Sequence, residues 1–149
     1  INLSTSYKTF GEDRLKLQVV YGEGIGNYMN DGGIDIAPDS SDPTTAQAEA
    51  VAILGVVAYY DHYWNDKWST SVGYSINDTD TSDGQAGIEF AKGQIAQINL
   101  LHTPTDNVLL GTEFIWGERE DINGKTGSDH RIQFSLKISF DTGNLMRSR

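Results

Sequence analysis

The stretch 131-RIQFSLKISF-140 alternates polar and apolar residues without a break. Ile132 and Phe134 fall on one parity, whereas Arg131 and Gln133 fall on the other. Successive side chains of a β-strand point to opposite faces, so the two faces of this strand must meet very different surroundings. Two architectures satisfy the pattern: a soluble sheet that covers a core, or a membrane barrel whose outer face meets lipid.

Composition keeps both architectures open and excludes others. The 149 residues have a mean hydropathy of -0.42, and no apolar run approaches the ~18 residues of a membrane-spanning helix. Barrel strands place only alternate residues in lipid, so they score as hydrophilic on average. The net charge of -10 argues against a nucleic-acid partner. The chain has no cysteine, which excludes disulfides and thiolate metal sites.

The same alternation recurs along the chain and predicts an all-β protein with about seven strands. Most of them approach the ~9–11 residues that a tilted strand needs to cross a bilayer. The expected strands cover residues 1–8, 14–21, 50–64, 67–76, 94–102, 108–117 and 130–140.

Short and long connections alternate between these strands. Tight turns are expected at 10–13, 64–67 and 103–106, and long polar loops at 25–47, 77–90 and 118–129. Outer-membrane barrels have this asymmetry, with short turns on the periplasmic side and long loops outside, whereas a soluble sandwich has no reason to sort its loops by length. The pattern therefore predicts an antiparallel up-and-down transmembrane β-barrel. A soluble all-β ligand-binding module is the alternative.

Aromatic residues gather at the expected strand ends. Tyr60, His62, Trp64 and Trp68 flank one tight turn, and Trp116 lies toward the opposite end of its strand. Amphipathic rings at headgroup depth form such girdles in membrane barrels, although rings of this kind also pack soluble cores.

Three motifs are considered and set aside. The glycines of 22-GEGIG-26 are followed by a polar loop instead of the amphipathic helix that a dinucleotide site needs. The acids of 78-DTDTSDG-84 lack the glycine position and the closing glutamate of a calcium loop. The three histidines sit on separate strands with no partner at metal spacing. We therefore expect no catalytic residues, no metal and no cofactor.

Three segments together resemble the C-terminal part of the DcaP-like trimeric porins of Gram-negative outer membranes: 58-AYYDHYWNDKWSTSVGYS-75, 113-EFIWGERED-121 and 131-RIQFSLKISF-140. The resemblance implies a barrel of about sixteen strands, a homotrimer in the bacterial outer membrane, and passage of small anionic solutes such as dicarboxylates. About seven strands are expected here, and single-chain bacterial barrels have an even number. We therefore expect residues 1–140 to be the C-terminal half of a larger porin, with 141–149 as a hydrophilic tail.

The parity opposite the apolar one predicts the wall of a channel. Five cations share it: Lys8, Arg14, Lys16, Arg131 and Lys137. Asp61 and Glu113 share it too, while twelve of the 21 acids fall in the three expected loops. The hypothesis is a passive channel whose lumen cations attract anions. Two alternatives stay open: lumen charges that are merely hydrated and paired, and a small structural outer-membrane barrel.

Overall fold

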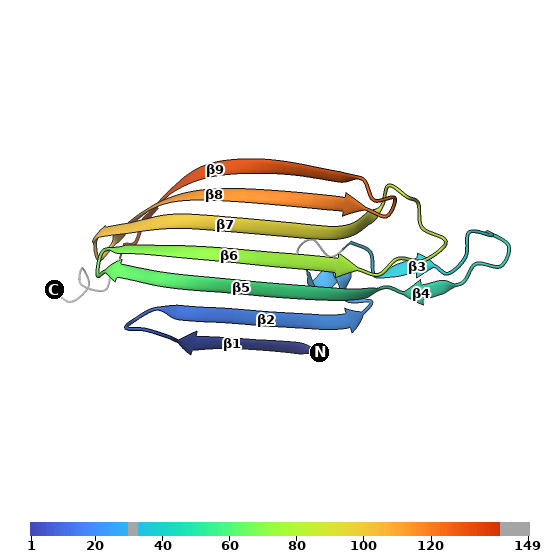
Figure 1. Ribbon diagram of the computed structural model, residues 1–149, viewed down its shortest axis with the longest axis horizontal. Coiled ribbons are helices and arrows are strands. Elements are labelled where there is room, and N and C mark those ends of the chain that lie inside the picture. The colour runs from blue at the N-terminus through green and yellow to red at the C-terminus, as the bar shows by residue number, and fades with distance from the viewer. Residues whose placement is uncertain (30–32, 141–149) are drawn as a thin grey trace, which may run out of the picture.

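The computed structural model describes residues 1–29 and 33–140, and seven of its strands form one antiparallel sheet in chain order (Figure 1). These strands are β1 (Asn2–Lys8), β2 (Arg14–Glu23), β5 (Ala52–Asn65), β6 (Trp68–Thr79), β7 (Phe90–Thr105), β8 (Val108–Asp121) and β9 (Thr126–Ile138). The predicted all-β class and antiparallel order are confirmed. The sheet does not close on itself, so β1 and β9 are its two edges. The expected tail at 141–149 lies outside the described residues.

The connection between β2 and β5 has structure that the sequence did not predict. The expectation was a long polar loop at 25–47. Instead a 3₁₀ turn, η1 (Gly26–Tyr28), is followed by a two-stranded ribbon of β3 (Ile36–Pro38) and β4 (Ala48–Ala50). The ribbon extends past the ends of β5 and β6, at the end of the sheet where the long connections gather (Figure 1).

The prediction of a long loop at 118–129 is wrong. β8 continues to Asp121 and β9 begins at Thr126, so a tight hairpin joins them. Beyond residue 117 the alternation of apolar and polar residues stops, because Glu118 and Glu120 occupy the positions where apolar residues would continue it. The hydrogen-bonded pairing of β8 with β9 nevertheless continues through these residues. Polar side chains beyond a hydrophobic belt end the sequence signal without ending the strand.

The registers assign every strand residue to one of two faces. Lys16 pairs with Tyr59, and Leu17 pairs with Ala58, so neighbouring strands keep their alternation in step. We call the side that carries Lys16 the polar face and the side that carries Leu17 the apolar face.

Little of the chain is buried. Among the described residues the buried hydrophobic side chains are Ala37, Val51 and Ile53, which form a small cluster at the long-connection end. No described helix is long and apolar enough to cross a membrane. The apolar face therefore has no core packed against it within the described chain.

Candidate functional site

The apolar face carries large hydrophobic side chains that are open to the surroundings. Phe134 is 82% exposed and Ile132 is 67% exposed, although both lie in a regular strand. The same face holds further exposed residues of all seven strands: Leu3, Tyr7, Leu17, Val19, Tyr21, Leu54, Val72, Tyr74, Ile98, Leu100, Leu110, Phe114, Leu136 and Ile138. Soluble monomers rarely expose a contiguous apolar surface of this extent.

These residues form a belt that crosses the hydrogen-bonded rows obliquely. One row runs across the sheet through Leu3, Val19, Val56, Ile76, Gln94, Glu118 and Ser128. It is apolar on the first four strands and polar on the last three. A second row, nearer the short turns, is apolar on the last strands through Leu110 and Leu136.

The angle between this belt and the hydrogen-bonded rows gives the tilt that the strands have when the belt is level. The apolar stretch is centred between Leu17 and Val19 on β2 and between Phe134 and Leu136 on β9. The registers carry the β2 centre to position 129 on β9, whereas the β9 centre is position 135, an offset of six residues. Six residues span ~20 Å and five strand spacings span ~24 Å, so a level belt requires strands tilted by ~40°. Membrane barrels have tilts of this size.

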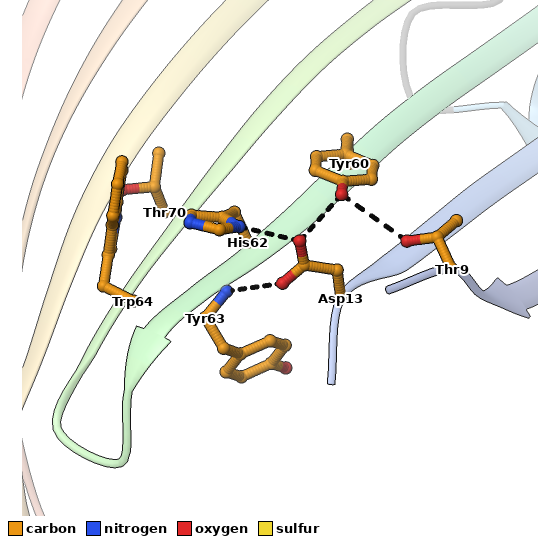
Figure 2. Close-up of polar contacts among 7 residues, drawn as sticks. All are labelled: Thr9, Asp13, Tyr60, His62, Tyr63, Trp64 and Thr70. Atoms are coloured by element: carbon orange, nitrogen blue, oxygen red, sulfur yellow. Dashed lines mark hydrogen bonds and ion pairs between the residues drawn. The ribbon is translucent and has the colours of Figure 1, made fainter. Parts of the chain in front are cut away.

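At the short-turn end, Asp13 binds the turn between β1 and β2 to strand β5 (Figure 2). Its Oδ2 accepts a hydrogen bond from the Tyr60 hydroxyl at 2.7 Å and lies 2.7 Å from Nδ1 of His62. Its Oδ1 accepts the Tyr63 backbone N–H at 2.9 Å. The hydrogen bond with His62, followed by those with Tyr63 and Tyr60, lowers the pKa of Asp13 to about 2. The ionised carboxylate therefore holds the turn in place.

Aromatic residues continue from this cluster along the short-turn rim. The rings of His62 and Trp64 meet edge to face at 4.3 Å, and the Trp64 indole N–H donates to Thr70 Oγ1 at 2.9 Å (Figure 2). On the neighbouring strands, Trp68 stacks on His102 with ring centroids 4.0 Å apart. The predicted gathering of aromatics at this turn is confirmed. With the strands tilted, these rings lie along one rim of the apolar belt.

The structure places the five predicted cations on the polar face, in two separate groups. Lys8, Arg14 and Lys16 lie on the first two strands, while Arg131 and Lys137 lie on β9 at the far edge. Four strands separate the two groups. Within this sheet the cations therefore flank the polar face and do not form one cluster.

Two of the cations are paired. Lys8 Nζ lies 2.7 Å from Glu12 Oε1, and Lys16 Nζ lies 2.6 Å from Asp61 Oδ2. The carboxylate of Asp61 also accepts a hydrogen bond from Ser71 Oγ at 2.6 Å. Within the described residues Arg14, Arg131 and Lys137 form no ion pair, so these three are the cations open to a solute.

Arg119 also lies on the polar face, and sequence reasoning missed it. Arg119 pairs with Gly93 of β7, so its side chain lies on the face opposite to the one that carries the apolar residues of β8. Nε donates to Asp121 Oδ1 at 2.8 Å, and the guanidinium lies 5.6 Å from the centre of the Phe90 ring. The even spacing of six residues from Glu113 on the same strand was the available signal, but residues 118–129 were expected to be a loop.

A cleft of about 980 Å³ opens on the polar face near the long connections. Strand residues line it, among them Gln18 and Ser75 and, farther across the sheet, Arg119, and Tyr28 and Met29 of the β2–β5 connection line it as well. No group of three or more potential metal ligands occurs in the described part of the chain. The lining of the cleft is therefore mixed, because apolar sheet residues such as Val57 and Ile95 lie beside polar ones such as Gln94.

Comparison with known proteins supports the fold. No protein-family model matches the chain, and a search of curated proteins finds no match. Among solved structures, an outer membrane channel has the same arrangement of strands. This is the crystal structure of the outer membrane channel DcaP of Acinetobacter baumannii, with a TM-score of 0.77 and 22% sequence identity. The alignment covers 93% of this chain and 40% of the DcaP chain. The resemblance found in the sequence is confirmed at the level of the fold.

Proposed function

We propose that this chain forms part of a passive channel in the bacterial outer membrane. The observation that carries the proposal is the oblique apolar belt, because its ~40° inclination to the ladder is the tilt that puts every strand's apolar stretch at one bilayer depth. The apolar face then meets lipid, and the polar face lines water. The fold shared with a solved outer membrane channel supports the same function.

The complete barrel contains more strands than these seven. Backbone groups along the free edges of β1 and β9 need hydrogen-bond partners inside a membrane, because lipid offers none. The chain spans 40% of the length of the DcaP channel. We infer a closed barrel of about sixteen strands that assembles as a homotrimer, with the short turns in the periplasm and the long connections outside.

The charges of the polar face favour anions. The polar face of the sheet carries the five cations and Arg119 against four acids: Asp61, Glu113, Asp121 and Asp129. Asp61 is already bound to Lys16, and Asp121 to Arg119. A low-dielectric wall concentrates the field of such charges on passing ions. The guanidinium groups of Arg14 and Arg131 suit carboxylates best, since their planar donors bind both oxygens. Small anions such as dicarboxylates are therefore the proposed solutes, and no chemistry or cofactor is involved.

Planar-bilayer recording of the complete barrel tests this function. In a salt gradient the reversal potential should show preference for chloride over potassium, and the double variant Arg14→Glu/Arg131→Glu should shift that preference toward the cation. Lys125→Glu is the matched control, because Lys125 is exposed in the hairpin beyond the belt. Absence of any conductance would overturn the channel. Cation preference, or an unchanged ratio in the double variant, would overturn the anion-selective wall.

A further inference from the structure

The connection after β2 turns back over the polar face. The side chain of Met29 packs directly over Gly55 of strand β5, so closely that a Cβ added to Gly55 would lie 2.5 Å from Met29 Cε. Ile25 occupies the corresponding place over Gly22, where an added Cβ would lie 3.1 Å from its side chain. Because Gly22 and Gly55 have no side chains, the segment formed by residues 25–29 can lie close to the polar face at these two positions.

Several contacts fix this 25–29 segment in place. Ile25 and Met29 pack against the buried cluster of Ala37, Val51 and Ile53. Where the segment begins, the Gly24 N–H donates to the Val51 carbonyl at 2.9 Å. The Val51 N–H in turn donates a backbone hydrogen bond to the Asp35 carbonyl at 3.0 Å.

The side chain of Asp35 closes the arrangement. Its Oδ1 accepts the Asn27 backbone N–H at 3.0 Å, and its Oδ2 accepts a second hydrogen bond from the Asn27 side-chain amide. The segment is therefore held by backbone, carboxylate and apolar contacts at once, which is typical of a fixed element of structure and not of a hinged one.

Tyr28 is the exposed tip of this anchored segment. Its side chain is 90% exposed and borders the cleft, although its neighbour Met29 is packed on the sheet. The opposite part of the cleft is formed by Phe90 and Arg119. The Phe90 ring covers Gly93, and Arg119 is held by Asp121 Oδ1 and by the Ile88 carbonyl at 3.2 Å.

We propose that the 25–29 segment is a fixed constriction of the channel, with Tyr28 as its narrowing side chain. This inference rests on the proposed channel function, since only then is the polar face a lumen. A solute that enters from the long-connection end passes between an aromatic and thioether surface on one side and the Phe90–Arg119 corner on the other. The constriction limits solutes by size before they reach Lys8, Arg14 and Lys16 near the short turns.

Thiol labelling tests the placement of Tyr28. The chain contains no cysteine, so Tyr28→Cys introduces a single thiol into it. Reaction with a bulky uncharged methanethiosulfonate reagent, added to open channels of the complete barrel, should lower the single-channel conductance. Tyr21→Cys is the matched control, because Tyr21 is also an exposed tyrosine near this end but lies on the apolar face. Its labelling should leave the conductance unchanged.

A second variant tests the size limit itself. Tyr28→Ala should raise the conductance and speed the entry of larger uncharged sugars in liposome swelling, while Tyr21→Ala should change neither. If the parent barrel conducts but labelled Tyr28→Cys conducts as before and Tyr28→Ala admits no larger sugar, the constriction is wrong and the channel stands. If the parent barrel does not conduct, the channel function itself fails.

Discussion

The tilt of the apolar belt predicts that the cost of a new arginine depends on its depth in the bilayer and not on its row in the ladder. Val19 and Ser128 lie in the same hydrogen-bonded row on the apolar face. Val19 is one residue from the belt centre of β2, so Val19→Arg should cost ~2–4 kcal/mol of folding free energy, the value for arginine near the midplane. Ser128 is seven residues from the β9 centre at position 135.

With a rise of ~3.3 Å per residue and a tilt of ~40°, seven residues correspond to ~18 Å along the membrane normal. That distance exceeds half of the ~25 Å apolar band, so Ser128→Arg should cost ~0–1 kcal/mol. A second pair separates the faces at one depth. Phe134→Arg should cost as much as Val19→Arg, whereas Gln133→Arg on the polar face should be tolerated.

The assay is equilibrium folding of the complete barrel into lipid vesicles over a range of urea concentrations, with the free energy of unfolding compared among the four variants. Equal costs at Val19 and Ser128 would refute the tilt. Equal costs at Phe134 and Gln133 would mean that both faces are packed alike, and the membrane assignment would be wrong.

Three further predictions follow from the structure. Proteinase K added to intact cells should cut the exposed connection at 80–89 and spare the short turns; cleavage confined to the turn at Asp66 would reverse the orientation. Folding lowers the pKa of Asp13 from 3.8 to about 2, so the stabilisation that its carboxylate gives is complete above pH ~4 and is lost as the pH falls toward 2. The melting temperature in detergent should therefore lose this pH dependence in Asp13→Asn but keep it in Asp66→Asn. Gly73→Ala should lower stability by ~1–3 kcal/mol, since its Cβ would lie 2.1 Å from the aromatic ring that covers it, and urea unfolding should show no such loss for Gly127→Ala, where nothing lies within 4 Å.

The sequence determined the strands, the short turns, two of the three long connections, and the side on which each strand residue lies. This was possible because period-two alternation is a local property: Arg131 and Phe134 are assigned to opposite faces by counting alone. The five cations were placed on one face in the same way, and the registers agree with that count. Their role in selectivity is still a prediction.

Other features depended on the registers between strands, which no local pattern contains. The belt's tilt, the pairing of Lys16 with Asp61 and the hydrogen bonds that join Asp13 to Tyr60 all link positions more than forty residues apart. The continuation of β8 and β9 past the belt was missed because polar residues outside lipid carry no alternation. The segment that carries Tyr28 was read as an outer loop, and only the tertiary structure places it over Gly55, since its position is set by where the sheet lacks a side chain.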